Sequence, residues 1–211
     1  MIKAIFFDYD DTLVQTKISK WDALKATGKR FYNLDITSED ITPFWGLPYE
    51  KMLVGVLRNA DTLENLKQNY EQTHVQFPML AHKDAQGVVG KLLKKYPVGI
   101  VTASSRKLVL EDLTMLHFPI DKFIYIQTSE DTTIHKPDPD VFIPILKILH
   151  ENQIPNSEIL YVGDSLKDYQ AANGAGLQFL GITHGITSGE EFKKSNVQTV
   201  TSFNDLFSKL C

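Results

Sequence analysis

Five short apolar segments constrain the fold of this chain more than any other feature of its 211 residues. Each segment is continuously apolar instead of alternating between apolar and polar residues, which is typical of parallel strands covered on both faces of a sheet. Helical patterns separate most of the segments and predict βαβ units. The chain is therefore expected to form an α/β fold around a Rossmann-like parallel sheet. The predicted strands span residues 2–7, 98–102, 122–126, 159–163 and 178–182.

One long interval interrupts this alternation. Residues 15–83 lack a convincing buried strand and show helical patterns instead. Pro48 is placed to open one helix, and Asp61 to cap the next. We therefore expect a core domain formed by residues 1–14 and 84–211, with an all-helical subdomain, residues 15–83, inserted after the first strand.

Composition narrows the class of protein. Hydrophobic residues make up 43% of the chain, which is enough for a sizeable core. The net charge is −4 and the Lys and Arg residues form no block, which argues against a nucleic-acid partner. Cys211 is the one cysteine, so no disulfide can form within the chain. The apolar runs are too short to span a bilayer, and the first residues do not resemble a signal peptide. We expect a cytoplasmic monomer or weak homo-oligomer with no membrane partner.

Polar side chains gather where the predicted strands end. Open parallel sheets bind their ligands at the carboxyl ends of the strands, so these side chains are candidates for one site. Acids, hydroxyls and one lysine thus stand on the rim where a ligand would bind. The residues at or beyond these strand ends are Asp8, Asp10, Asp11, Thr102, Ala103, Ser104, Lys136, Asp164 and Asp168.

These residues fall into four ordered motifs: DYDDT at 8–12, VGIVTAS at 98–104, Lys136 within HKPDPDVF, and GDSLKD at 163–168. In this order they resemble the motifs of the haloacid dehalogenase-like (HAD) hydrolase superfamily. The resemblance is to its phosphatase branch with an α-helical cap, which includes phosphoglycolate phosphatases and beta-phosphoglucomutases. It implies a HAD-like catalytic core, whereas the helical insertion matches the cap of the family in position and type only.

The resemblance implies a division of labour among the carboxylates. Asp8 would be the nucleophile that takes the phosphoryl group, and Asp10 would protonate the leaving oxygen and later activate water. A Mg²⁺ ion would be held by the side chain of Asp8, the main-chain carbonyl of Asp10 and the side chain of Asp164. An all-oxygen site of this kind suits Mg²⁺, which keeps part of its coordination for substrate phosphate and water.

The remaining motif residues would bind the phosphoryl group or support the metal site. Thr102, with the amides of Ala103 and Ser104, would bind the phosphoryl oxygens. Lys136 would neutralise the nucleophile and the transferring oxygens. Asp168 would orient the metal site without binding the ion directly.

Four further residues have roles outside these motif assignments. Asp11 stands where many relatives of this branch have glycine, and we expect it to point away from the metal and to hydrogen-bond the turn backbone. Trp45, Gly46 and Tyr49 belong to the aromatic segment FWGLPY of the cap and are candidates for substrate selectivity. Core packing within the cap is an equally good interpretation of Trp45.

The expected function is a Mg²⁺-dependent phosphatase that hydrolyses small phosphate monoesters through an aspartyl-phosphate. A sugar phosphomutase of the same branch is one alternative, although Tyr49 stands where those caps usually carry arginine. A catalytically silent HAD-fold binding or regulatory protein is another. Receiver-type signalling domains also combine Asp, Thr or Ser, and Lys, but they are shorter and have no helical insertion. Phosphoglycolate, sugar phosphates, nucleoside monophosphates and pyrophosphate all remain open as substrates.

Overall fold

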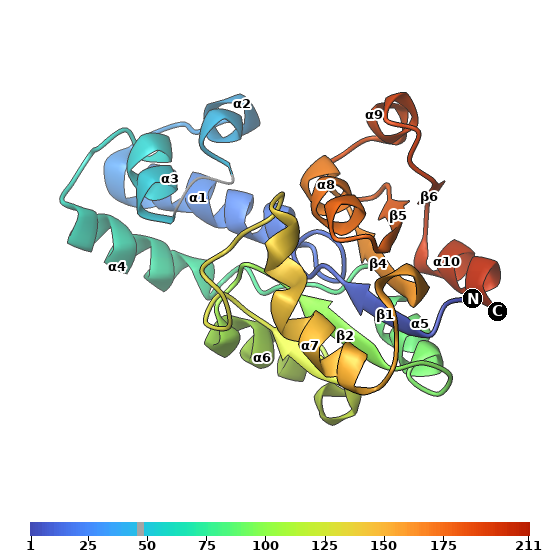
Figure 1. Ribbon diagram of the computed structural model, residues 1–211. Coiled ribbons are helices and arrows are strands. Elements are labelled where there is room, and N and C mark those ends of the chain that lie inside the picture. Colours follow the sequence, from blue (N-terminus) through green and yellow to red (C-terminus); the bar gives the residue numbers. More distant parts are fainter. Residues whose placement is uncertain (46–48) are drawn as a thin grey trace. The chain divides into compact units, whose positions relative to one another are not determined.

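The computed structural model of the protein describes residues 1–45 and 49–211. Six strands form one parallel sheet in the order β3-β2-β1-β4-β5-β6 (Figure 1). This arrangement confirms the expected α/β fold with a parallel sheet. The strands are β1 (Ala4–Phe7), β2 (Val98–Val101), β3 (Tyr125–Gln127), β4 (Ile159–Gly163), β5 (Gln178–Ile182) and β6 (Thr199–Val200).

Three of the predicted strands have different bounds in the structure. β1 begins two residues later than predicted, and β2 ends one residue earlier. The segment predicted at residues 122–126 forms β3 only from Tyr125, because Lys122 ends a short 3-10 helix, η2 (Ile120–Lys122), and Phe123 follows as its C-cap residue. The edge strand β6 was not predicted, and its two residues are too few to produce a readable pattern.

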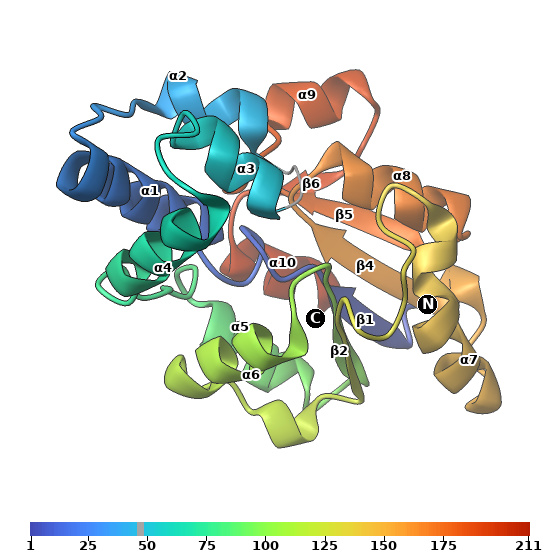
Figure 2. The same cartoon turned by 90° about the vertical axis from the view of Figure 1, so that its left-hand side faces the viewer.

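The strands of the sheet send alternate side chains to its two faces. In β1, Ile5 and Phe7 enter one apolar core, while Ala4 and Phe6 enter the other. The first core is closed by the helices α5 (Ala85–Leu92), α6 (Arg106–Met115) and α10 (Phe203–Leu210). The second is closed by α7 (Ile143–Glu151) and α8 (Leu166–Gly174), and Figure 2 shows the two groups on opposite faces. The short helix α9 (Gly189–Lys194) packs Phe192 against Gly181 of β5.

Two helical segments follow Lys136, one directly after the other, and each has a proline in its first turn. The carboxylate of Asp138 accepts from the amide of Asp140 at 3.0 Å and begins a 3-10 helix, η3 (Pro139–Phe142). α7 then begins anew, with Pro144 in its first turn. A proline is tolerated there because the amide it lacks would have no partner within the helix.

The inserted segment forms a separate helical unit with its own apolar core. Its core includes Leu24, Leu53 and Leu66, all fully buried. Its elements are α1 (Thr16–Tyr32), α2 (Ser38–Ile41), η1 (Thr42–Phe44), α3 (Tyr49–Val56) and α4 (Leu63–His74). Pro48, the expected opening residue of α3, lies outside the described residues.

The cap of α4 is one residue later than predicted. Thr62, and not Asp61, is the N-cap residue, and its hydroxyl accepts from the amide of Asn65 at 3.4 Å. The carboxylate of Asp61 accepts instead from the amide of Thr62 at 2.7 Å and from the side chain of Asn65 at 2.9 Å. Both residues are good capping types, and the contacts of Asp61 reinforce the turn before the helix.

The chain divides into one unit of Met1–Gln15 with Ala81–Cys211 and a second unit of Thr16–Leu80. The insertion is thus slightly shorter than the expected interval 15–83. Residues after Leu80 belong to the sheet unit because Ala81 forms a bridge with Val14 and the amide of His82 donates to the carbonyl of Leu13 at 3.0 Å. None of the helices in the described parts of the chain combines the length and apolar character needed to cross a membrane.

Two histidines far apart in the sequence stack behind the loop after β1. The ring centroids of His82 and His184 are 3.7 Å apart, with an angle of 14° between the rings. Nε2 of His184 lies 3.0 Å from the carbonyl oxygen of Thr12. Burial, with the charge of His184 as a smaller cause, lowers the pKa of His82 to about 4. Burial likewise lowers the pKa of His184, so the folded state favours the uncharged pair.

The histidine pair predicts a specific acid sensitivity. Below the ordinary histidine pKa of about 6.5, the unfolded chain binds protons that folded His82 resists down to a pKa of about 4. The stabilising effect of the uncharged ring is therefore present above about pH 6.5 and is lost as the pH falls towards 4. Wild type should lose more stability than His82→Gln between these limits, as measured by urea unfolding without divalent cations.

Wild type must be compared with the variant because buried carboxyl groups with a raised pKa stabilise the folded protein as the pH falls, which is opposite to the effect of His82. The pKa of Asp164, for example, is raised by burial to about 7, which favours the folded state as the pH falls. His135→Gln, at an exposed loop position, is the matched control. An identical pH dependence for wild type and His82→Gln would show that His82 does not titrate in this way.

Candidate active site

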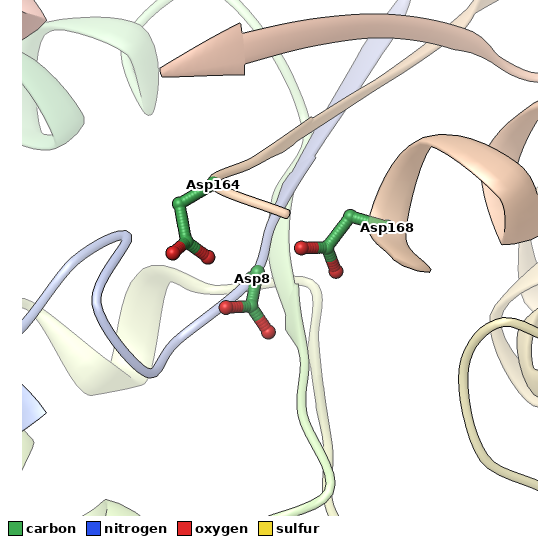
Figure 3. A group of neighbouring side chains, drawn as sticks. All are labelled: Asp8, Asp164 and Asp168. Carbon is green, nitrogen blue, oxygen red and sulfur yellow. The ribbon is translucent and has the colours of Figure 1, made fainter. Parts of the chain in front are cut away.

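Three carboxylates meet at the point where the strand order reverses. Asp8 follows β1 and Asp164 follows β4, the adjacent central strands between which ligands bind in sheets of this order. Asp168 joins them from the first turn of α8. Figure 3 shows their side chains pointing toward one another, and carboxylate oxygens of all three lie within 4.8 Å of each other. Each of the three residues is buried.

Lys136 comes from the segment between β3 and α7 and lies beside these carboxylates. Its ammonium donates to Oδ1 of Asp8 at 2.5 Å and to Oδ1 of Asp168 at 2.6 Å. The lysine side chain is only 12% exposed, so both ion pairs are largely removed from water. Burial acts to lower the pKa of Lys136, but the charges of Asp168 and Asp8 outweigh it and hold the pKa well above the ordinary value.

The site keeps an excess of negative charge. Burial, followed by the charge of Asp168, raises the pKa of Asp164 to about 7. Burial also raises the pKa of Asp8, against the opposing charge of Lys136. One ammonium does not balance three clustered carboxylates. A buried group of hard oxygen donors with unbalanced negative charge fits a small divalent cation.

Asp168 supports the site through both of its oxygens. Oδ1 accepts from Lys136, while Oδ2 accepts from the amide and the hydroxyl of Ser165 at 3.0 and 2.5 Å. The contacts with Ser165 form the capping box that begins α8. Asp168 therefore fixes the lysine and the start of the helix together, while its role in orienting a metal site stays a prediction.

The hydroxyl motif after β2 meets the loop after β1 at Asp10. The hydroxyl of Ser104 donates to Oδ2 of Asp10 at 2.6 Å, and that of Thr102 lies 3.3 Å from the same oxygen. The amide of Ser104 also donates to the hydroxyl of Thr102 at 3.0 Å. Thr102 is buried and Ala103 is exposed. The N-cap position of α6 is occupied by Ser105, so Ser104 stays available to the loop.

Asp11 has a left-handed backbone conformation in the loop after β1. Its φ is 56°, in the left-handed region that glycine adopts freely and that short polar residues tolerate. The carboxylate is not one of the three that converge around Asp8, but its charge contributes to the raised pKa of Asp164. A hydrogen bond from the Asp11 side chain to the turn backbone stays a prediction.

A loop after β5 holds Asp164, and no pattern in the sequence predicts this contact. The amide of Ile186 donates to Oδ2 of Asp164 at 2.6 Å, while the hydroxyl of Thr12 donates to Oδ1 at 3.2 Å. Gly185 passes so close that a Cβ atom there would lie 2.1 Å from Oδ2. The loop therefore requires glycine at this position to hold the carboxylate. A single glycine among twelve has no sequence pattern that would have revealed this role.

Other supporting contacts were also missed. Tyr9 lies between Asp8 and Asp10, is buried, and donates from its hydroxyl to Oδ2 of Asp112 on α6 at 2.8 Å. This bond ties the loop after β1 to the helix that follows the hydroxyl motif. It joins residues 103 positions apart, a separation that no local pattern can report.

The candidate selectivity residues belong to the helical unit. The ring of Trp45 packs edge-on against Trp21, with the centroids 5.7 Å apart. Tyr49 is 41% exposed and its ring lies 6.0 Å from that of Tyr70. The contact of Trp45 fits a packing role, while Tyr49 keeps an accessible face. Gly46 lies outside the described residues.

Comparison with known proteins adds independent information. A family model described as haloacid dehalogenase-like hydrolase matches residues 5–182. A Clostridium perfringens protein provisionally named pyrophosphatase PpaX is 30% identical over 202 residues, which cover 93% of this chain and 91% of the relative. A phosphoglycolate phosphatase from Photorhabdus laumondii is 28% identical over 221 residues, covering 99% and 92% of the two chains.

Solved structures agree with these matches. A haloacid dehalogenase-like hydrolase from Bacteroides fragilis, also provisionally assigned, has a TM-score of 0.76 at 27% identity and covers 98% of this chain and 100% of its own. A Thermotoga maritima protein provisionally assigned as beta-phosphoglucomutase shares the fold, with a TM-score of 0.83 at 18% identity and coverage of 99% and 98%. The resemblance drawn from the four motifs is confirmed, and the chain belongs to the haloacid dehalogenase-like hydrolases.

Proposed function

We propose that this hydrolase is a Mg²⁺-dependent phosphatase that cleaves small phosphate monoesters through an aspartyl-phosphate on Asp8. The observation that carries the proposal is the pairing of Asp8 with Lys136 at 2.5 Å inside a buried carboxylate group. A carboxylate placed beside a cation can meet an anionic phosphoryl group with reduced repulsion. The two relatives named as phosphatases support the same class of reaction.

The reaction divides between Asp8 and Asp10. An oxygen of Asp8 forms a bond to phosphorus while the bond from phosphorus to the leaving oxygen breaks, and Asp10 gives that oxygen a proton. In the second step Asp10 takes a proton from water, whose oxygen attacks phosphorus and releases phosphate and free Asp8. The hydroxyl of Ser104 donates a hydrogen bond to Asp10 at 2.6 Å. This contact holds the carboxyl group that transfers the proton next to the phosphate-binding motif.

Other residues bind the transferring group. Thr102 and the amides of Ala103 and Ser104 donate to the phosphoryl oxygens. Lys136 balances the charge of Asp8 and then of the phosphoryl group. The carboxylates of Asp8 and Asp164, with the main-chain carbonyl of Asp10, would hold Mg²⁺. That ion would balance the negative charge of these carboxylates.

The proposed substrates are small phosphorylated metabolites. The two relatives are named for different substrates, pyrophosphate and phosphoglycolate. Their sequence identities to this chain are similar, at 30% and 28%. A substrate panel should therefore contain both, with sugar phosphates and nucleoside monophosphates. Transfer between the two positions of a sugar phosphate would favour the mutase alternative. Absence of turnover on the whole panel would favour a binding protein. Trp45 and Tyr49 stay predictions for substrate selectivity.

Replacing Asp8 and Asp10 tests the two chemical roles. Asp8→Asn should remove both turnover and labelling of the protein by phosphate, because no nucleophile remains. Asp10→Asn should lower kcat by about 100-fold or more for an alkyl phosphate, since general acid catalysis contributes roughly 10²–10⁴-fold. For p-nitrophenyl phosphate, whose leaving group needs no proton, the first step should be slowed much less, so a burst of nitrophenolate should precede the slow second step, in which the base is still missing. Asp140→Asn, at an exposed position, should match wild type. Undiminished turnover by Asp8→Asn would contradict the mechanism.

Thermal unfolding tests the metal site without measuring activity. Mg²⁺ should raise the Tm of wild type, because a ligand that binds only the folded state stabilises it. Asp164→Asn should lose this increase. At pH 8 without metal, the variant should be at least as stable as wild type, because burial and neighbouring charge raise the pKa of Asp164 to about 7 and the charged form is disfavoured. An equal Mg²⁺ response in both proteins would exclude Asp164 as a ligand.

Gly185 provides a test of how Asp164 is held. Gly185→Ala places a Cβ atom where it would lie 2.1 Å from Oδ2 of Asp164, so the carboxylate must move. The apparent Mg²⁺ affinity, from Tm measured against Mg²⁺ concentration, should fall by about tenfold or more, as for other changes that disturb the orientation of a ligand. Gly87→Ala is the control, since a Cβ there meets nothing within 4 Å. Unchanged affinity in Gly185→Ala would show that the loop does not set the ligand.

A further inference from the structure

Tyr161 places a single hydroxyl at the centre of the site, although none of the four motifs includes it. The residue lies in β4 and is completely buried. Its ring packs edge-on against Phe142 at a centroid distance of 4.9 Å. The hydroxyl lies 3.0 Å from the ammonium of Lys136 and 3.0 Å from the carbonyl oxygen of Val101. Burial raises the pKa of the phenol well above its ordinary value, so the group stays protonated.

The hydroxyl completes the hydrogen bonding of the buried lysine. An ammonium has three N–H groups. Those of Lys136 reach Asp8 at 2.5 Å, Asp168 at 2.6 Å and Tyr161 at 3.0 Å. Tyr161 is the neutral partner of the three, and it holds the ammonium without adding negative charge. Because a buried donor without a partner is costly, removal of this oxygen would favour movement of the lysine towards another acceptor.

The other side of the hydroxyl is fixed by the sheet. A phenol has one proton, and the carbonyl of Val101 at 3.0 Å is a closer acceptor than Asp168 at 3.4 Å. Val101 ends β2 and directly precedes Thr102, while β1 lies between β2 and β4. Tyr161 therefore reaches across the central strand that leads to Asp8. Because the hydroxyl donates a hydrogen bond to the carbonyl oxygen of Val101, the lone pairs of the phenol oxygen are free to accept from the ammonium of Lys136.

We propose that Tyr161 is a positioning residue, whose hydroxyl sets the place of the Lys136 ammonium relative to Asp8 by bonding it to the carboxyl end of β2. The consequence for catalysis rests on the proposed phosphatase function. The positioning itself is a property of the folded protein alone. The contacts of Tyr161 and Lys136 connect the four parts of the chain that carry the hydroxyl motif, the lysine, the nucleophile and the second acidic motif.

Nitrogen NMR of the lysine side chains tests the positioning directly. In protein with ¹⁵N-labelled lysine, the Lys136 ammonium should give a signal protected from exchange with water, assigned by its absence in Lys136→Gln. Tyr161→Phe keeps the ring and removes only the hydroxyl, so this signal should broaden or disappear. Tyr169→Phe is the matched control. Tyr169, on α8, is half-buried, and its ring packs at 5.6 Å against Phe179, whose ring also lies 6.3 Å from that of Tyr161. The signal should persist in this variant.

Kinetics then test the consequence for the reaction. Tyr161→Phe should lower kcat by about tenfold, the effect of one hydrogen bond to a charged group, while KM changes by less. Tyr169→Phe should retain the kinetics of wild type. A role in packing alone would lower the Tm of Tyr161→Phe but would leave kcat of the folded protein and the lysine signal unchanged.

Each outcome is decisive. Persistence of the Lys136 signal in Tyr161→Phe overturns the proposal, whatever happens to kcat. A lost signal with unchanged kcat also overturns it, because the position of the ammonium would not matter to the reaction. A lost signal in a protein without turnover on any phosphate would support the positioning and refute the phosphatase. Should Tyr161→Phe not fold, the wild-type protein must show a slowly exchanging Tyr161 hydroxyl proton close in space to Lys136, and its absence overturns the proposal.

Discussion

The mutual repulsion of Asp8, Asp164 and Asp168 is the constraint on which the rest of the site depends. Three buried carboxylates lie together at the carboxyl ends of β1 and β4 and the start of α8. Burial of like charges is unfavourable unless each is paired or hydrogen-bonded. The fold meets this requirement with Lys136 between Asp8 and Asp168, and with donors from Thr12 and Ile186 on Asp164. The remaining negative charge makes a cation the natural completion of the site.

The strands and the strand-end residues could be predicted because their signals are local. A continuous apolar run identifies a buried parallel strand, and the rule that ligands bind at carboxyl ends then selects Asp8, Thr102 and Asp164. Their convergence follows from topology, without any knowledge of side-chain contacts. The same reasoning fails for β6, which has only two residues. It also places the start of β3 too early, since Phe123 and Ile124 extend the apolar run of the sequence but precede the strand.

The contacts that support the site could not be predicted, for a physical reason. Tyr161 reaches Val101 across 60 positions, and Thr12 reaches Asp164 across 152. Such contacts depend on the packed geometry of several elements, and no spacing in the sequence encodes them. Gly185 illustrates the same limit, because its importance lies in the side chain that approaches it. Asp11 lies between these cases: its left-handed conformation suits a position where many relatives have glycine, while the effect of its charge on the pKa of Asp164 required the structure.

The bridge between Val14 and Ala81 has a consequence for how such proteins diversify. It brings the two points where the helical unit leaves and rejoins the sheet unit next to each other. An insertion with adjacent ends places little demand on the domain that receives it, because the gap can be closed by a short turn or by another folded segment. The sheet and its charged edge can therefore be inherited unchanged while the inserted segment is exchanged, lengthened or lost.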